Sequence, residues 1–283
     1  MANKNRDKRL PRNFHKTFIP ERQYINAMLQ FAAKGQSGDM QEIARATGIP
    51  TGKSSGKVPA ILDYCRGLGL VRLVDNQKRS SIKSPELTDF GRVVLLEDPF
   101  LKCAISQWIA HFNLCSPRKG ADIWYQVFFM QSQLFTGSFK RKDLEKSLQV
   151  IYGVPNGNLI GPLVGMYEDE SSFKLCGVLS DSDGIIFRKI APIVDESGRG
   201  YGAWLLQLMS DYFPNQDQIS ILELDKVAGW KTIPGWFGAS FCDVVDLIEQ
   251  KGLIEVDRHM NPWLLRAKKT VSKAWQEIYD DMI

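Results

Sequence analysis

The sequence contains no long apolar run and no apolar N-terminal segment. Its longest hydrophobic stretches, such as residues 93–96 and 127–130, stop far short of the roughly 20 residues that a membrane-spanning helix needs. Residues 1–12 are polar and basic and lack the apolar core of a secretory signal. We therefore expect a cytoplasmic protein with no membrane partner.

Cysteine and histidine are also sparse. The 283 residues include five cysteines and three histidines, no two cysteines have Cys-x-x-Cys spacing, and the histidines lie far apart. Isolated cysteines in odd number are typical of free thiols in a reducing compartment, and a structural zinc site would need short-spaced pairs of ligands. The sequence therefore predicts buried free thiols, no metal site and no cofactor.

Catalytic signatures are missing as well. The loop around Gly52 superficially resembles a P-loop, which requires a glycine, four residues and then Gly-Lys-Ser/Thr after a buried strand. Gly48 lies one position too close to Gly52, and Val58 stands where a hydroxyl would have to follow Gly56-Lys57. No nucleophile elbow or acid–base pair is visible either. We therefore expect no catalytic residue and no enzyme activity.

What the sequence does contain is an uneven distribution of charge. Residues 1–83 carry 16 lysines and arginines against 6 acids, whereas the remaining residues carry 20 against 26. A basic disordered tail would account for the charges up to residue 16 but not for those in the patterned segment that follows. A basic module joined to a mildly acidic body is a common footprint of a nucleic-acid-binding protein.

The N-terminal third has the pattern of a winged helix-turn-helix. Three segments carry apolar residues at helical spacing, Asp39 can cap the second, and Gly48 and Gly69 suit the ends of the second and third. Thr88 can cap a fourth helix. The expected elements are helices from 20–21 to before 35, 40–47, 58–68 and 89–96, and strands 70–74 and 81–87 around a turn at 75–80.

This pattern predicts binding to double-stranded DNA. The major groove admits one helix, here the third, and basic residues beside it and on the hairpin would neutralise phosphates. Glycine amides with adjacent lysines and serines in the loop 50–57 also suit a phosphate of nucleic acid. Winged helices also serve as protein–protein modules, so that alternative stays open. The candidate DNA-binding residues are Lys53, Ser54, Ser55, Lys57, Arg66, Arg72, Lys78, Arg79 and Lys83.

The middle of the chain predicts helices with an aromatic core. Aromatic and aliphatic residues recur at helical spacing from residue 99 to about 152, which is more typical of a core than of a partner groove. Strands at 173–179 and 184–190 would flank a turn at 180–184. The acids at 168–170 with Asp181 and Asp183 could form a metal cluster, but aspartate and glycine are what a tight turn requires, and we favour the turn.

The final third repeats the N-terminal pattern. Residues 42–48 parallel 223–229, and 69–71 parallel 252–254, with a two-residue difference in the interval. The second copy carries acids along its third helix and strand, so we expect it to dock protein. The predicted fold is mainly α (α+β): a basic arm and winged helix-turn-helix at 1–98, a helical linker domain with a β-hairpin at 99–198, and a second winged-helix-like domain at 199–283.

Three stretches, at residues 14–22, 48–57 and 87–92, carry a resemblance to a known family. It is an uncharacterised bacterial family, known only as a domain of unknown function, whose genes neighbour DNA phosphorothioation and phage-defence genes, including one for a sulfurtransferase. The resemblance runs along nearly the whole chain, and the His-x-Thr-Phe segment at His15 is its most specific part. It implies a role in DNA modification or restriction, and the family offers no established catalytic residues to carry over.

Three functional hypotheses follow, of which an enzyme is the least favoured because no catalytic motif is visible. The first is a DNA-binding subunit or regulator of a bacterial phosphorothioation-type modification or phage-defence system, acting with a protein partner. The second is an adaptor that docks a sulfurtransferase-like enzyme without binding DNA itself. His15 lies between Phe14 and Phe18 in the basic arm without a recognisable nucleophile, so we expect these residues to anchor the arm rather than to catalyse. The oligomeric state does not follow from the sequence.

Overall fold

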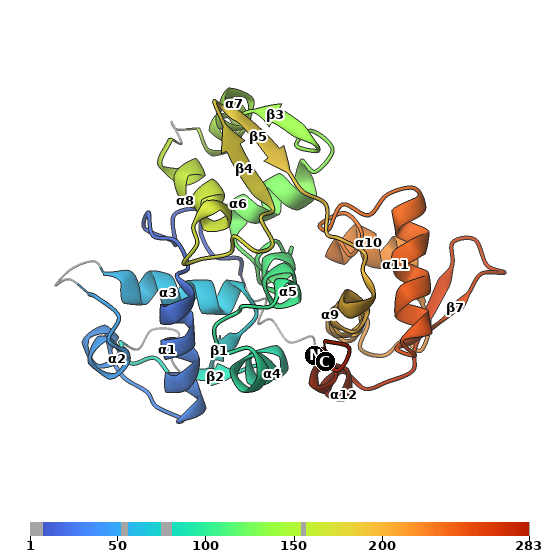
Figure 1. Cartoon of the computed structure of the whole chain (residues 1–283), viewed down its shortest axis with the longest axis horizontal. Coiled ribbons are helices and arrows are strands. Elements are labelled where there is room, and N and C mark those ends of the chain that lie inside the picture. The colour runs from blue at the N-terminus through green and yellow to red at the C-terminus, as the bar shows by residue number, and fades with distance from the viewer. Residues whose placement is uncertain (1–7, 52–55, 75–80, 154–156, 283) are drawn as a thin grey trace. The chain divides into compact units, whose positions relative to one another are not determined.

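The computed structural model describes residues 8–51, 56–74, 81–153 and 157–282. The chain divides into two compact units, Met1–Lys189 and Ile190–Ile283. Both consist mostly of helices with small antiparallel sheets (Figure 1), so the fold is mixed α+β. No helix among the described residues is long and apolar enough to cross a membrane. The finer three-part division of the chain remains a prediction.

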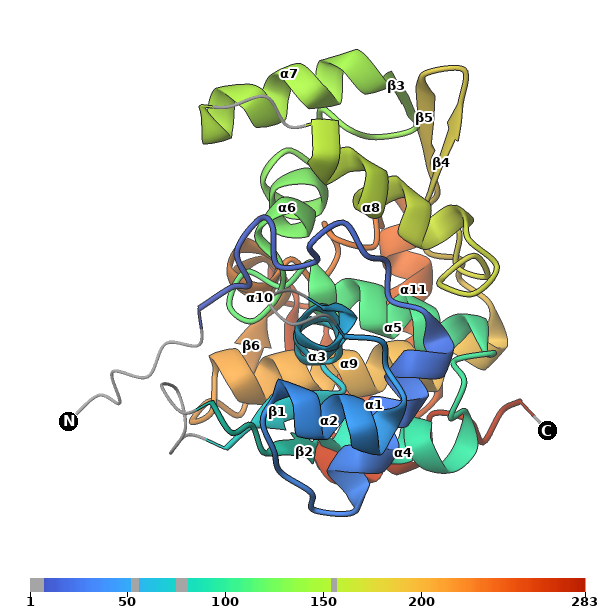
Figure 2. The same ribbon diagram turned by 90° about the vertical axis from the view of Figure 1, so that its left-hand side faces the viewer.

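The first unit begins with three helices, a hairpin and a fourth helix. These are α1 (Arg22–Ala33), α2 (Met40–Thr47), α3 (Lys57–Gly67), β1 (Val71–Leu73), β2 (Pro85–Leu87) and α4 (Asp89–Glu97). The expected helices agree with these bounds to within about two residues, and the turn at 75–80 lies outside the described residues. In Figure 2 the other elements of this group lie below α3, which contacts α1, α2 and β1.

Local capping explains where α2 begins and ends and where α4 begins. The Asp39 carboxylate accepts hydrogen bonds from the amides of Gln41 and Glu42, and Glu42 accepts one from the Asp39 amide in return. Gly48 ends α2 with φ +70°, a left-handed conformation that favours glycine. Thr88 caps α4 by accepting a hydrogen bond from the Gly91 amide at 2.9 Å. The predicted caps at Asp39, Gly48 and Thr88 are therefore confirmed.

The rest of the first unit contains more structure than the sequence predicts. Its elements are α5 (Ala104–Leu114), α6 (Asp122–Tyr125), a π-helix (Gln126–Met130), β3 (Ser138–Lys140), α7 (Arg141–Tyr152), α8 (Gly157–Glu168), β4 (Leu179–Ser182) and β5 (Ile185–Arg188). The strand expected at 173–179 instead spans Leu179–Ser182, and the turn expected at 180–184 is the two-residue turn Asp183-Gly184, both with positive φ. β3 and α8 were not expected.

The aromatic stripe of this region forms a core. Trp108, Phe112, Trp124 and Phe128 are all buried, as the helical spacing predicts. The Trp124 indole N–H donates to the Tyr167 hydroxyl at 2.9 Å, and that hydroxyl lies 2.7 Å from a ring nitrogen of His111. Burial, with a smaller contribution from the Arg188 charge, holds the pKa of His111 well below its ordinary value, so the cluster is an uncharged part of the core.

The basic arm packs against this core. Phe14 is buried with its ring edge-on to Tyr64 of α3, at 4.7 Å between centroids. His15 is also buried, and its Nδ1 accepts a hydrogen bond from the Thr17 amide at 3.0 Å. The Tyr64 hydroxyl donates to the carbonyl of Phe18 at 3.0 Å. These contacts agree with an anchoring role for the arm.

Free thiols are distributed unevenly between the two units. Cys65, Cys115 and Cys176 are buried in the first unit, and Cys103 is partly exposed there. Burial raises the pKa of the buried thiols. The second unit contains Cys242, which is partly exposed.

The second unit repeats the element order of the first unit's N-terminal part. It contains α9 (Gly198–Tyr212), β6 (Ile219–Ser220), α10 (Ile221–Ala228), α11 (Ala239–Gln250), β7 (Ile254–Asp257), β8 (Leu264–Ala267) and α12 (Val271–Gln276), after a 3-10 turn at Asp195–Ser197. The sheet order is β6-β8-β7. Helix α9 contacts α10, α11 and α12, which are labelled in Figure 1. In the first unit, Gly38 forms a bridge with Lys83 at the position that β6 takes here.

The parallel sequence segments occupy equivalent positions. Gly229 ends α10 with φ +74°, as Gly48 ends α2. Gly252 and Gly69, with φ of +71° and +76°, each lie between the third helix and the following strand. The repeat observed in the sequence therefore corresponds to a repeat in the structure.

Candidate nucleic-acid interface

A hollow of about 390 Å³ lies between α3, β1 and the residues that lead into β2. Its walls include the apolar side chains Leu62, Val71 and Leu73, and its one acidic lining residue among those described is Asp63. Five basic residues line it. They are Lys8 of the arm, Arg66 of α3, Arg72 of β1, Lys83 before β2, and Lys119 of the loop between α5 and α6.

Arg66 and Asp63 form an ion pair within α3. Arg66 Nη1 donates to Asp63 Oδ1 at 2.7 Å, and the two side chains are 36% and 30% exposed. Burial raises the pKa of Asp63, although the charges of Arg66, Lys16 and Lys83 oppose this shift. A guanidinium has five N–H donors, more than this contact uses, so Arg66 can contact a second anion.

Arg72 lies on the exposed face of the hairpin. Its guanidinium contacts Glu86 of β2 at 3.1 and 3.2 Å, and the residues are cross-strand partners. The side chains are 68% and 50% exposed. Exposed ion pairs contribute little to stability, about 0–1 kcal/mol, so Arg72 can exchange this carboxylate for a phosphate at small cost.

Lys57 is placed differently from the other predicted residues. Its ammonium contacts Glu21 at 2.5 Å and lies over the rings of Tyr24 and Phe18, and its side chain is 17% exposed. It does not line the hollow. These contacts join the start of α3 to the start of α1, and a phosphate contact for Lys57 remains a prediction.

The structure thus brings Arg66, Arg72 and Lys83 together at one hollow. The predicted residues Lys53, Ser54, Ser55, Lys78 and Arg79 lie outside the described residues and remain predictions. The sequence did not identify Lys8 and Lys119. They join the hollow because Leu10 and Ala121 form a parallel bridge, in which the Leu10 amide donates to the Gly120 carbonyl at 2.8 Å. Only the basic composition of the arm indicated Lys8.

Of the acids at 168–170, Asp181 and Asp183, two contact the hairpin turn, whereas Asp169 and Glu170 contact Ser171 and Lys174. Glu168 accepts a hydrogen bond from the Asp181 amide, and Asp181 contacts both the Gly184 amide and Arg141. Within the described ranges, no three His, Cys, Asp or Glu side chains are grouped to hold a metal ion. The turn interpretation therefore accounts for the contacts of Glu168 and Asp181.

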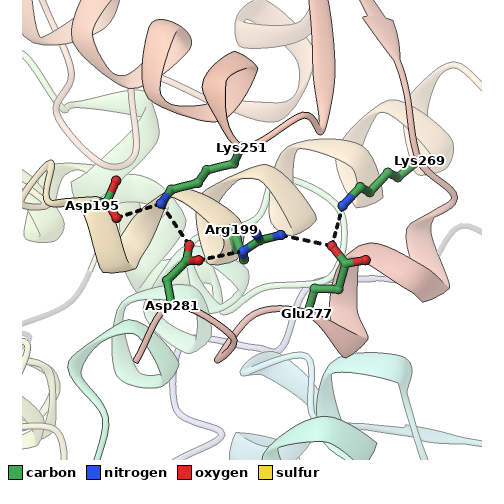
Figure 3. Close-up of polar contacts among 6 residues, drawn as sticks. All are labelled: Asp195, Arg199, Lys251, Lys269, Glu277 and Asp281. Carbon is green, nitrogen blue, oxygen red and sulfur yellow. Dashed lines mark hydrogen bonds and ion pairs between the residues drawn. The ribbon is translucent and has the colours of Figure 1, made fainter. Parts of the chain in front are cut away.

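Several basic residues in the second unit form ion pairs with acids of that unit. Arg199 contacts Glu277 and Asp281, and Lys251 contacts Asp195 and Asp281 (Figure 3). In the same network Lys269 contacts Glu277. The network joins the start of α9 to the end of α11 and to the segment after α12.

The third helix of the second unit is acidic. α11 contains Asp243, Asp246 and Glu249 and no lysine or arginine. Arg258, next to β7, contacts both Asp246 and Glu249. Burial favours a raised pKa for Glu249, but hydrogen bonds from Arg258 and the Val256 amide, together with the Arg258 charge, outweigh it and lower that pKa.

Comparison with known proteins identifies similar structures. No family model matches the chain, and no curated protein matches it. A magnesium ion-bound crystal structure of SspB has a TM-score of 0.66 and 17% sequence identity, covering 95% of this chain and 87% of that one. A second SspB crystal structure has a TM-score of 0.65 and 18% identity with the same coverage. At this level of identity, the similarity shows a shared fold.

Proposed function

We propose that this chain is a DNA-binding subunit or regulator of a bacterial phosphorothioation-type DNA-modification or phage-defence system. The observation that carries the proposal is the hollow beside α3, where five basic residues surround one acid. The fold similarity to SspB and the family resemblance of the sequence support the biological setting. The proposal gives the chain a binding role and assigns it no catalytic residue.

The winged-helix interpretation supplies the mechanism. The order of α1, α2, α3, β1 and β2 supports α3 as the helix that enters the major groove, with the hairpin as the wing. Arg66, Arg72 and Lys83 would then contact phosphates on one side of α3. Such contacts supply affinity and register but little sequence information.

A salt titration on duplex DNA tests the proposal. If about five basic residues each contact a phosphate, log K against log salt should have a slope of roughly −4 to −5. Fluorescence anisotropy of a labelled duplex between about 50 and 300 mM salt measures it, with arms using unmodified and phosphorothioate-modified DNA. Affinity that is independent of salt, or absent at low salt, would exclude this function.

Magnesium belongs in the same experiment because one similar SspB structure contains it. The titration is run with and without magnesium chloride, and the DNA is afterwards inspected for strand breaks. Intact DNA agrees with a binding role. If strand breaks require magnesium and disappear when this chain is mutated, the chain is a nuclease and the purely binding role is wrong.

The adaptor function is the second candidate, and the acidic helix α11 favours it. Three acids at the position equivalent to α3 repel DNA phosphates and suit a basic protein surface. If the chain copurifies with a modification enzyme, and mutation of Asp243 and Asp246 but not of Arg66 and Arg72 disrupts that complex, the adaptor function gains support. The two functions can also be divided between the two units.

A further inference from the structure

Among the described residues, the hollow beside α3 is lined by one acidic side chain, that of Asp63. Asp63 contacts Arg66 at 2.7 Å within a lining of five basic residues. Carboxylate and phosphate oxygens are alternative acceptors for the same guanidinium donors. We propose that the hollow is an oxyanion site for a phosphate group, in which Asp63 is a competitor that a bound phosphate displaces from Arg66. This inference rests on the proposed function only for the source of the phosphate, a DNA backbone.

The geometry permits this exchange. The Asp63–Arg66 pair is about one-third exposed at both side chains, so breaking it costs little, within about the range of a surface ion pair. The apolar side chains Leu62 and Val71 line the same hollow. Apolar walls lower the local dielectric constant, which strengthens the attraction between the basic residues and an entering anion.

Three charged groups face Asp63 from different elements. They are Arg66 on α3, Lys16 on the arm and Lys83 before β2. Burial favours the protonated carboxyl and these charges favour the carboxylate, with burial the larger effect, so the pKa of Asp63 is raised. Protonation of Asp63 removes the competitor. The affinity of the hollow for an anion of constant charge should therefore increase as the pH falls.

Sulfate is the appropriate first probe because its charge does not change between pH 5 and pH 8. We expect sulfate to raise the melting temperature in a saturable manner at fixed ionic strength. Asp63→Asn should bind sulfate about three- to five-fold more tightly than the unmodified protein at pH 8, and Arg66→Gln should weaken binding by a similar factor. The difference between Asp63→Asn and the unmodified protein should shrink toward pH 5.

Matched controls lie on α4. Glu97→Gln removes an exposed acid and Arg92→Gln an exposed arginine, and neither residue lines the hollow. Both variants should bind sulfate like the unmodified protein. The same five proteins are then titrated with duplex DNA, where Asp63→Asn should increase and Arg66→Gln decrease the affinity.

The outcomes separate this inference from the proposed function. Sulfate binding that responds to both variants, without any DNA binding, supports the hollow and overturns the DNA-binding function. If DNA binding is salt-dependent but neither Asp63→Asn nor Arg66→Gln alters the affinity for DNA or for sulfate, the oxyanion site is wrong and the DNA-binding function stands. If Asp63→Asn weakens sulfate binding while its melting temperature without sulfate is unchanged, Asp63 is not a competitor and the inference is wrong.

Discussion

The third helices of the two repeated groups occupy equivalent positions and carry opposite charge. α3 contains Lys57 and Arg66 against Asp63, whereas α11 contains three acids and no basic residue. Both are followed by a left-handed glycine and a hairpin. The comparison indicates that the fold determines where this helix lies and that its side chains determine the kind of partner it can accept.

The surrounding charges increase this contrast. In the first unit, basic residues from the arm, α3, the hairpin and the loop after α5 line one hollow. In the second unit, Arg199, Lys251 and Lys269 contact acids of the same unit. The net charge of each unit does not reveal this contrast, because the contrast depends on which charged residues the fold places next to one another.

The largest predicted effect concerns two glycines that allow close packing. A Cβ on Gly91 would lie 1.9 Å from the Leu70 carbonyl oxygen, whereas one on Gly202 would lie 2.5 Å from the end of the Leu253 side chain. Backbone cannot move aside as a side chain can. We expect Gly91→Ala to lower the free energy of unfolding by about 3–5 kcal/mol and Gly202→Ala by about 1–2 kcal/mol. Urea denaturation measures both, and equal losses would contradict the difference.

Acid should destabilise the first unit before the second. Burial, opposed by a weaker backbone hydrogen bond involving Arg12, lowers the pKa of His15 to about 4 from 6.5. The unfolded chain therefore binds a proton that the folded chain does not between these values. His15 then contributes a loss of up to about 3 kcal/mol as the pH falls from about 6.5 to 4.

In the second unit, the corresponding loss of stability is expected at lower pH. Burial favours a raised pKa for Asp281, but hydrogen bonds from Arg199 and Lys251 outweigh it and lower that pKa. Its contribution is lost only as the pH falls below about 4, the ordinary value of an aspartate. Thermal unfolding between pH 7 and pH 3 measures both, with His15→Asn as the control. Because burial also lowers the pKa of His111, His15→Asn should reduce but not abolish the loss above pH 4. A loss that is unchanged in His15→Asn would assign the acid sensitivity to another group.

Paired removal of basic residues tests the electrostatic contrast directly. Arg66→Gln with Arg72→Gln should lower DNA affinity about tenfold and reduce the magnitude of the salt slope by about 2. Arg266→Gln with Lys268→Gln removes the same charge from exposed positions on and next to β8. This second pair should change affinity less than twofold. Equal effects would mean that DNA contacts both units.

The smallest predicted difference concerns the caps of the final helices. Thr88 Oγ1 accepts from the Gly91 amide at 2.9 Å and donates to the Gly69 carbonyl at 2.6 Å. Thr270 Oγ1 accepts from the Lys273 amide at 3.4 Å, a weaker contact. We expect Thr88→Ala to cost about 1 kcal/mol and Thr270→Ala about half of that. Replacement of either threonine by serine should restore most of the loss in chemical denaturation.

Local signals in the sequence predicted local structure well. α2 has the expected bounds because Asp39, Glu42 and Gly48 define its ends through contacts a few residues apart. α8 was missed because Gly161, Pro162 and Gly165 disfavour a helix, and burial of neighbouring side chains overrides that preference. β3 was missed because its three residues form a strand only through pairing with β5.

The same limit applies to the candidate site. Arg66, Arg72 and Lys83 belong to the local helix-and-hairpin pattern, so charge and spacing indicated them. Lys119 lies far from them in the sequence and reaches the hollow only because the arm bridges to residue 121. The contact between Lys57 and Glu21 likewise depends on how α1 and α3 pack. Contacts of this kind cannot be predicted from spacing along one chain.

The buried thiols can be used to measure how often the core of the first unit opens. Alkylating reagents react with the thiolate, and Cys65, Cys115 and Cys176 are shielded and held in the protonated form. Their labelling therefore requires the core of the first unit to open, and its rate measures how often that happens. Cys103 and Cys242 are partly exposed, so their labelling does not require such opening and serves as an internal reference. Mass spectrometry after timed alkylation thus yields the opening kinetics of the first unit from a single sample.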